Sequence, residues 1–402
     1  MLKGERKAVD FICRNIYAVV GGALVVLALL IRWNMRDFIS GDVQSCLLVW
    51  YEKYKAAGGL AGLSINMESY YVPYMLFLSL ITYIPKNPVY LIKVLSIVFE
   101  FATAFFAAMI VREIFKESKR CKLYAFIVFF FFIYSPIVVI NGALWGQNDY
   151  IYMAFIFASV YFLIKEKSIS SFVFLGLAFS VKMQTIFMLP VFILIYIVKR
   201  SFSALNFLII PAVYFVCGLP AVFMGRPLSE VLSINFSQVD FFKILSMQCP
   251  NVYYFVDGNY DLYANAGILF AVAMIAAFSL LVIKNRKSLG IKDILYIAMW
   301  MPMTCVMFLP AMHERYSIIF VSFAALLYLF DRKKVWIALS LNAIAFFSYM
   351  PTLTNVLILD YKILSILQLV IYCFITLDAA LHFLNAQSEC AQKEPQRETV
   401  TV

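Results

Sequence analysis

The sequence predicts an all-α, polytopic membrane protein with roughly ten to twelve transmembrane helices. Of its 402 residues, 64% are hydrophobic and only 14% are charged, and the mean hydropathy is +0.87. A soluble globular chain carries about 25% charged residues. Apolar runs recur that approach or reach the length of about 17 to 25 residues that a spanning helix needs. The clearest runs are Ile16–Ile31, Leu123–Ile140, Phe207–Phe223, Ala264–Ile283 and Ile318–Phe330.

The basic residues lie in short clusters between these runs. The formal net charge is +10, from 33 Lys and Arg against 23 Asp and Glu. Clusters that flank hydrophobic runs are typical of cytoplasmic loops, so membrane topology explains the charge and no nucleic-acid partner is expected. The clusters expected in the cytoplasm are Lys165/Lys167, Lys199/Arg200, Lys284/Arg286/Lys287/Lys292 and Arg332/Lys333/Lys334.

The first apolar run is predicted to be an uncleaved span with a cytoplasmic N-terminus. Lys3, Arg6, Lys7 and Arg14 precede it, and no small-residue cleavage site follows it. Even numbers of crossings between the basic clusters place the C-terminus on the same side. We therefore expect a multi-pass protein of the cell membrane, with one domain over residues 1–384 and a short polar cytoplasmic tail over residues 385–402.

Residues 34–70 are predicted to form a first extracytoplasmic loop that carries short amphipathic helices. Two apolar runs follow, Tyr70–Ile84 and Val89–Val111, and then the basic segment Arg112–Lys122. Two crossings would place that basic segment outside. Either one run is re-entrant or interfacial, or the basic segment breaks the positive-inside rule. Both alternatives are open at this point.

The later spans are predicted in pairs. Two short helices meet near Lys182–Gln184, and a hairpin of spans encloses a second long extracytoplasmic loop over residues 224–262. Two further pairs turn at His313–Tyr316 and at Pro351–Asn355. Together with Trp145–Asp149, these turns place every polar motif on the extracytoplasmic face.

Asp42 is the first candidate for chemistry. An acid held at a membrane boundary loses hydration, which raises its pKa toward the value that a general base needs. Gly41 before it allows the backbone to turn sharply. The alternative is that Asp42 is a solvated loop acid or a helix N-cap.

Trp145, Gln147 and Asp149 are candidates for binding a sugar or an acceptor. An indole, a carboxamide and a carboxylate within five residues suit a sugar, which has hydroxyl edges and apolar C–H faces. The alternative is an interfacial tryptophan belt followed by a cap at Asp149.

Lys182 and Gln184 interrupt a hydrophobic stretch. An intramembrane cation is costly and normally faces a cavity or a partner, so we expect Lys182 to bind a phosphate oxygen. The alternative is that its side chain extends to the membrane surface.

His313, Glu314, Arg315 and Tyr316 form the densest polar cluster. An imidazole and a guanidinium at the mouth of a span are suited to hold a phosphate or diphosphate through charge-assisted bonds. A structural ion-pair turn is the alternative. No second histidine follows at helical spacing, so the cluster is not a metalloprotease site.

Several kinds of site are not indicated by the sequence. The eight cysteines are scattered without zinc-site spacing, and there is no Gly-rich nucleotide loop and no Ser-His-Asp constellation. No cofactor is expected, and dependence on a divalent metal is left open. Without a nucleotide-binding fold, an activated sugar would have to arrive on a lipid.

The order of these motifs resembles that of the bacterial relatives of the second mannosyltransferase of glycosylphosphatidylinositol assembly, which belong to the GT-C glycosyltransferases. The resemblance runs from about residue 36 to residue 320. The motifs that carry it are Ser40-Gly41-Asp42 with Trp50 and Gly58-Gly59, Tyr70-Tyr71-Val72-Pro73, Trp145-Gly146-Gln147-Asn148-Asp149, Lys182-Met183-Gln184, Asn251-Val252-Tyr253 and Met312-His313-Glu314-Arg315-Tyr316. Two departures affect backbone shape more than chemistry, since Val72 replaces one proline of a usual pair and Met183 replaces another.

The resemblance implies a GT-C-like fold and an inverting enzyme that transfers a monosaccharide from a polyprenyl-phosphate donor to a glycan or lipid-linked acceptor. An acid in the first outer loop of such enzymes is the catalytic base, which corresponds to Asp42. We expect the donor phosphate to bind His313, Arg315 and Lys182. The sugar and acceptor are expected at Trp145, Gln147, Asp149, Gln184, Glu314, Tyr316 and Trp50. Mannose is suggested only by the family name.

Two other functions use the same kinds of residues. A lipid-linked oligosaccharide flippase or other transporter would place polar residues through the whole membrane depth or on both faces. A polysaccharide polymerase would join preassembled repeat units on the same lipid. The concentration of polar motifs on one face favours the glycosyltransferase over the transporter.

Overall fold

The computed structural model describes residues 3–66, 70–239 and 243–385, and the predicted tail beyond residue 385 lies outside this part. Helices make up almost all of its regular structure. The strands in the described part are β1 (Ser246–Met247) and β2 (Met312–His313), which pair in parallel. The all-α prediction is therefore confirmed.

Within residues 3–66, 70–239 and 243–385, seven helices are long and apolar enough to cross a bilayer, and a bent pair adds an eighth if it is counted as one span. The seven are α2 (Ile16–Asn34), α5 (Pro88–Ile114), α11 with the preceding 3-10 turn (Ala204–Phe223), α13 (Tyr260–Asn285), α14 (Ile291–Phe308), α16 (Val335–Thr354) and α17 (Tyr361–Leu384). The bent pair joins α6 (Cys121–Tyr134) to Pro136–Leu144 at 47°. A count of ten to twelve is reached only if shorter apolar helices cross as well.

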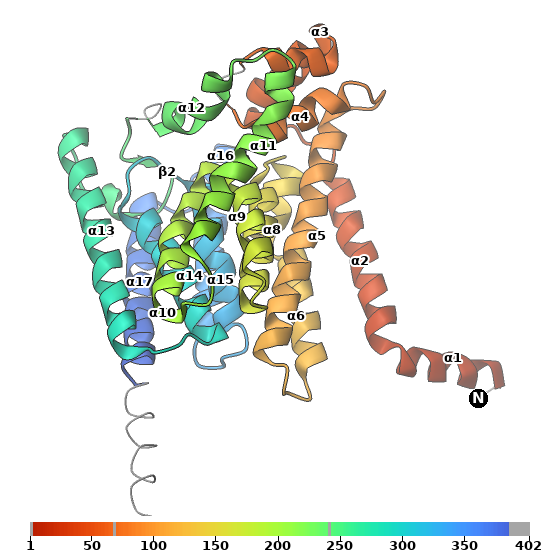
Figure 1. Ribbon diagram of the computed structural model, residues 1–402. Coiled ribbons are helices and arrows are strands. Elements are labelled where there is room, and N and C mark those ends of the chain that lie inside the picture. The colour runs from red at the N-terminus through yellow and green to blue at the C-terminus, as the bar shows by residue number, and fades with distance from the viewer. Residues whose placement is uncertain (1–2, 67–69, 240–242, 386–402) are drawn as a thin grey trace, which may run out of the picture.

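Four shorter apolar helices have 10 to 17 residues. They are α4 (Val72–Ile81), α8 (Asp149–Ile164), α9 (Ser168–Val181) and Met183–Lys199, which joins the turn η4 to α10 (Leu189–Lys199). Three of them, α8, α9 and α10, run alongside the long helices (Figure 1). The chain breaks at Lys182, where the backbone is extended between α9 and η4. The predicted meeting of two short helices near Lys182 is confirmed.

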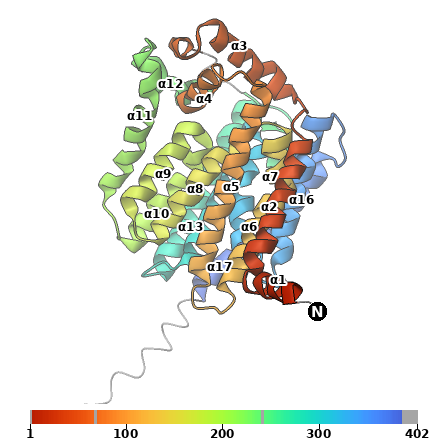
Figure 2. The same ribbon diagram turned by 90° about the vertical axis from the view of Figure 1, so that its right-hand side faces the viewer.

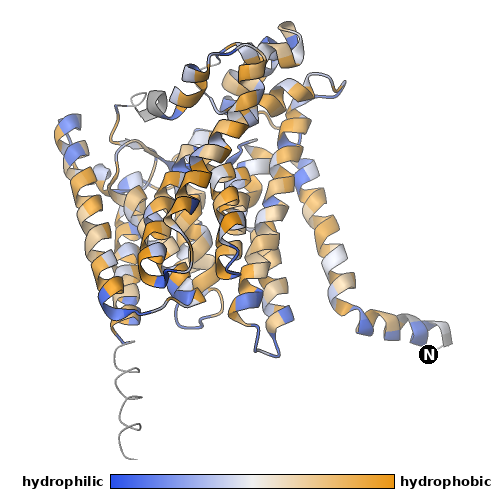
Figure 3. Cartoon of the chain, in the orientation of Figure 1, coloured by the Kyte–Doolittle hydropathy of each residue, from blue (hydrophilic) through white to orange (hydrophobic). Residues whose placement is uncertain are grey.

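The basic loops gather at one end of the bundle. Lys165 lies 3.0 Å from Glu113, and Lys199 lies 3.0 Å from Glu166, which ties the ends of α5, α8, α9 and α10 together. The rings of Phe115 and Phe330 meet at 5.5 Å. The start of α1 and the end of α17 lie at the same lower end in Figure 1, where Figure 3 shows a band of hydrophilic residues. We call this the basic end.

The position of α4 shows how the chain runs between residues 70 and 122. This helix lies with α3 (Leu48–Ala56) at the end opposite the basic end (Figures 1 and 2). Just beyond α4, the Tyr83 hydroxyl donates to the Gly58 carbonyl at 2.9 Å and accepts from the Leu60 amide. Only α5 crosses back, so Arg112–Lys122 reaches the basic end. The first of the two alternatives is the one that the structure adopts.

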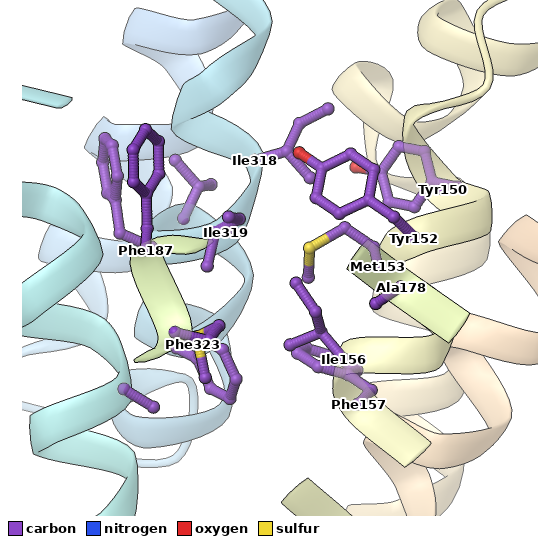
Figure 4. Close-up of a cluster of buried hydrophobic side chains, with 14 of the residues drawn as sticks. Tyr150, Tyr152, Met153, Ile156, Phe157, Ala178, Phe187, Ile318, Ile319 and Phe323 are labelled. Atoms are coloured by element: carbon purple, nitrogen blue, oxygen red, sulfur yellow. The ribbon is translucent and has the colours of Figure 1, made fainter. Parts of the chain in front are cut away.

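The core of the bundle is formed by helices that are apolar on all sides. α8 and α14 are buried along most of their length, and so is α15 (Ile318–Tyr328). Figure 4 shows α8 side chains on one side and Phe187, Ile319 and Phe323 on the other. The rings of Phe157 and Phe323 meet edge to face at 5.1 Å. Such all-round hydrophobicity is what a helix needs when other helices surround it.

α2 packs loosely against the bundle, since only 11% of the residues in its apolar stretch are buried. Polar contacts hold it. The Arg32 guanidinium pairs with Glu100 at 2.7 Å and donates to the Ile133 carbonyl at 2.8 Å. The Tyr134 hydroxyl donates to the Leu24 carbonyl at 2.6 Å. The loop that follows α2 contains Asp42, so these contacts also set where that loop begins.

Candidate active site

Four separate segments meet at the end of the bundle opposite the basic end. They are the turn after α2, the turn before α8, the break between α9 and η4, and the segment β2–η7 (Glu314–Ser317) between α14 and α15. The segments bring Asp42, Trp145, Gln147, Asp149, Lys182, Glu314 and Arg315 into one network of hydrogen bonds and ion pairs. Residues predicted from distant motifs therefore form one site.

The Asp42 carboxylate accepts three side-chain donors on a single oxygen. The Trp145 indole donates to Oδ2 at 3.0 Å, Arg315 donates at 3.3 Å, and the Gln147 amide also donates to this atom. The other oxygen, Oδ1, receives no hydrogen bond from any described residue. Asp42 begins the π-helical turn η1 (Val43–Leu47) but its side chain makes no cap bond there. The N-cap alternative is therefore wrong for Asp42.

Ser40 and Gly146 fix the turn that carries Asp42 against the Trp145 segment. The Ser40 hydroxyl donates to the Trp145 carbonyl at 2.7 Å and accepts from the Val43 amide at 3.3 Å. Gly146 has φ +78°, and a Cβ there would lie 2.7 Å from the Val43 side chain. The glycine lets the two turns approach closely enough for both Trp145 and Gln147 to reach Asp42.

The Trp145 indole faces the interior of the protein. Its side chain is buried, its ring meets Tyr349 edge to face at 5.5 Å, and the Arg315 guanidinium lies 4.8 Å from the ring centroid. A tryptophan of an interfacial belt would face lipid and headgroups instead. The belt alternative is therefore wrong, and Trp145 is part of the site wall.

Asp149 is a fully buried acid with two close partners. It pairs with the Lys182 ammonium through Oδ1 and accepts from the Asn141 amide through Oδ2 at 2.8 Å. Lys182 also lies 5.7 Å from the Tyr152 ring centroid and 5.9 Å from that of Tyr316. Lys182 therefore turns inward onto Asp149, so the alternative that its side chain extends to the membrane surface is wrong. Its binding to a phosphate oxygen stays a prediction.

Arg315 connects the buried and exposed parts of the network. Its guanidinium lies 3.4 Å from Glu314, 4.0 Å from Asp149 and 3.3 Å from Asp42. Glu314 is itself buried next to His313, whose Nδ1 is 3.7 Å from the carboxylate. Burial alone raises the pKa of Glu314, but the hydrogen bond with His313 and the charge of Arg315 outweigh it and hold this pKa below its ordinary value.

The three carboxylates differ sharply in access. The side chain of Asp42 is 42% exposed, whereas that of Glu314 is 4% exposed and that of Asp149 is fully buried. A base has to touch the proton that it removes. Asp42 is consequently the carboxylate of this network that a substrate reaches without rearrangement of the core.

Three predicted residues, Trp50, Gln184 and Tyr316, lie outside the network of hydrogen bonds and ion pairs. Trp50 is buried on α3 and packs on the Tyr70 ring at 5.0 Å, and the Tyr70 hydroxyl accepts from Asn148 at 2.8 Å. Gln184 is buried beside the break, and its Oε1 has no hydrogen-bond partner among the described residues. Tyr316 packs against the His313 ring at 5.2 Å and so lines the site without joining its ion pairs.

Sequence reasoning missed Asn141 and Ser96. Asn141 holds Asp149, and the Ser96 hydroxyl donates to the Gln147 carbonyl at 2.7 Å. A lone amide at the end of the long apolar run before Trp145 was the available signal for Asn141, since isolated polar groups in such runs need partners. Ser96 carried no such signal, because a serine hydroxyl bonds readily to its own helix.

Unpartnered polar atoms surround the inner side of the site. Among the described residues, buried side-chain oxygens without a hydrogen bond include the hydroxyls of Tyr150, Tyr152 and Tyr349 and Oδ1 of Asn148. Figure 4 shows the Tyr150 and Tyr152 hydroxyls at the upper edge of the apolar cluster. No group of three or more His, Cys, Asp or Glu in the described ranges has the arrangement of a metal site.

No protein-family model matches the chain, and a search of curated proteins likewise gives no match. The geometry of the site is therefore the basis for inferring its function.

Proposed function

We propose that the protein is a membrane glycosyltransferase that moves a monosaccharide from a polyprenyl-phosphate donor to a glycan or lipid-linked acceptor by a single inverting displacement. The observation that carries this proposal is the position of Asp42. Its carboxylate is the exposed one, its Oδ2 is held by three donors, and its Oδ1 receives no bond from the described residues. A fixed carboxylate with one oxygen available is suited to remove a proton from a positioned hydroxyl.

In this mechanism the acceptor hydroxyl gives its proton to Asp42 as its oxygen attacks the anomeric carbon. The bond from that carbon to the phosphate oxygen breaks, and polyprenyl phosphate leaves with the bonding electron pair. Attack from the face opposite the leaving group inverts the anomeric configuration. Trp145 and Gln147 contribute by orienting Asp42, and their remaining surfaces are suited to contact a sugar.

The leaving phosphate requires positive charge, and Arg315 is the cation next to Asp42. Arg315 is at present shared among Asp42, Glu314 and Asp149. The phosphate of the donor would compete with Asp42 for this guanidinium and release the base as it binds. His313 would assist at the same phosphate. Lys182 is neutralised by Asp149, so its role is to hold the Asp149 carboxylate in place more than to bind donor directly.

The side of the membrane follows from the charge distribution. The basic clusters lie at one end and the site lies at the other. By the positive-inside rule we assign the basic end, where α1 starts and α17 ends, to the cytoplasm and the site to the extracytoplasmic side. A lipid-linked donor suits that side, because its activated sugar is delivered within the bilayer.

The test uses purified protein in nanodiscs, polyprenyl-phosphate mannose or polyprenyl-phosphate glucose as donor, and a glycolipid extract of bacterial membranes as acceptor. The expected result is consumption of one donor and a product of inverted anomeric configuration. Asp42→Asn should bind donor and fail to transfer. The proposal would be overturned if the product retained the anomeric configuration of the donor, or if neither donor was consumed. Undiminished transfer by Asp42→Asn would also overturn it.

A further inference from the structure

The N-terminal helix α1 (Lys3–Arg14) leaves the bundle at the basic end. It runs outward from the start of α2, away from the other helices (Figures 1 and 2). Residues 4–7 and 9–14 are all exposed, and they include large apolar side chains, of which Phe11 is 62% exposed. A helix with exposed apolar side chains needs a surface to cover them.

The helix has two distinct faces. At 3.6 residues per turn, Arg6, Lys7, Asp10 and Arg14 fall on one arc of about 100°. Val9, Phe11 and Ile12 occupy the remaining arc, which also carries Glu5 of the first turn. Figure 3 shows hydrophilic and hydrophobic residues along the same helix. An arrangement of this kind is typical of helices that lie in the plane of a membrane interface.

The level of α1 is fixed by its neighbour. Only Asn15 separates it from α2, whose apolar stretch starts at Ile16. The end of α1 is therefore at the boundary of the hydrocarbon region, and an outward course keeps the rest of the helix near that boundary (Figure 1).

We propose that α1 lies in the bilayer interface at the basic end and binds the headgroups of anionic phospholipids through Arg6, Lys7 and Arg14. Val9, Phe11 and Ile12 would enter the acyl boundary below those headgroups. Charge complementarity selects this occupant, because Arg6, Lys7 and Arg14 outnumber Asp10 on the polar arc. The adjacent basic loops, such as Arg112–Lys122, extend the same positive surface around the bundle.

This inference does not depend on the reaction that the protein performs. It is tested with the full chain in nanodiscs that hold one copy each. Cysteines introduced as Ile12→Cys and Asp10→Cys lie on opposite faces of α1. Both substitutions are made in a Cys13→Ser background, because Cys13 lies on the same helix. Their reaction with a charged, water-soluble maleimide is followed by peptide-level mass spectrometry, which separates them from the other native cysteines.

In nanodiscs containing phosphatidylglycerol, Ile12→Cys should react about tenfold more slowly than Asp10→Cys, because it is covered by lipid. The difference should shrink in nanodiscs of phosphatidylcholine alone, and also when Arg6→Gln and Lys7→Gln are added. Equal rates in the anionic nanodiscs would overturn the interfacial placement. An equally large difference in both lipids would overturn recognition of anionic headgroups. Protection seen only with two copies per disc would assign the face to a second chain instead.

Discussion

Arg315 donates to Asp42 across 273 residues of sequence, from Nη1 to Oδ2 at 3.3 Å. The same guanidinium lies 3.4 Å from Glu314. One cation is thus shared by an exposed acid and a buried one. An anion that binds Arg315 therefore competes with the Asp42 carboxylate for the guanidinium. This competition predicts changes in ligand binding and in transfer that can be measured.

Asp42→Asn should lower transfer by about 10²- to 10⁴-fold, because the amide keeps the size of the side chain but accepts no proton at this position. Trp145 and Gln147 retain a neighbouring oxygen, so the protein should fold normally. Steady-state transfer and the thermal unfolding midpoint are measured together. A loss of folding would leave the rate uninterpretable, and Asp42→Glu then provides the comparison: partial activity with a normal unfolding midpoint is expected if the carboxylate itself is needed.

The same Asp42→Asn variant should bind polyprenyl phosphate about two- to fivefold more tightly. Removing the Asp42 charge frees Arg315 from a partly exposed ion pair that is worth about 0.5 to 1 kcal/mol. Binding to protein in detergent is measured by calorimetry. Asp37→Asn is the matched control, since Asp37 is an exposed acid of the same loop that pairs with Arg36. Unchanged or weaker binding by Asp42→Asn would refute competition at Arg315.

Lys182→Met should destabilise the protein by about 3 to 5 kcal/mol, because it leaves the buried Asp149 carboxylate without its ammonium partner. Adding Asp149→Asn should recover most of that loss. Chemical or thermal unfolding in detergent measures both changes. Lys165→Met serves as the control, since its pair with Glu113 is partly exposed and contributes about 0 to 1 kcal/mol. Equal losses for Lys182→Met and Lys165→Met would contradict the buried pair.

The stability of the fold should fall in acid through Glu314. Its pKa in the folded protein lies below the ordinary value of 4.5, so the carboxylate stabilises the fold above that value and this contribution is lost as the pH falls through the folded pKa. Unfolding midpoints of wild type and Glu314→Gln are compared from neutral pH to about pH 3. The unfolding midpoint of the wild type should fall more over the acid range than that of Glu314→Gln. If the two midpoints fall in parallel with pH, the lowered pKa of Glu314 is contradicted.

Gly146→Ala should destabilise the protein by about 1 to 3 kcal/mol and reduce transfer. The residue has φ +78°, and the new methyl group would press on Val43, directly after Asp42. Gly22→Ala on α2 is the matched control, because a Cβ there meets nothing within 4 Å and alanine favours a helix. If both substitutions change stability and transfer equally, then neither property depends on the close approach of the Asp42 and Trp145 turns.

The helical fold and most turns were predictable because lipid demands long apolar runs and basic loops mark one side. The course of the chain through α4 was not predictable. Val72–Ile81 is as apolar as a span, yet it is only ten residues long and lies with α3. Hydropathy reports whether a segment avoids water and does not distinguish a bilayer from a protein surface that covers it.

The members of the site were predictable as residues, but their pairing was not. Asp42, Asp149 and Arg315 were each expected to take part. Nothing local to their motifs indicates that Lys182 turns onto Asp149 or that Arg315 reaches Asp42, since both contacts depend on how α8, α9 and the β2–η7 segment pack. Trp50 was placed in the site by its motif, whereas α3 directs it against Tyr70.

The ion pair of Arg32 with Glu100 has a consequence for the lipid environment. α2 has few packing contacts, and this pair, with the neighbouring bond to Ile133, holds it at a point where both charged side chains are buried in the protein. Water weakens such a pair by raising the local dielectric. A bilayer of short acyl chains is thinner than a long apolar helix, so the water boundary lies closer to Arg32. The position of Asp42, ten residues further on, is thereby coupled to membrane thickness, so acyl chain length should act on turnover without any lipid entering the site.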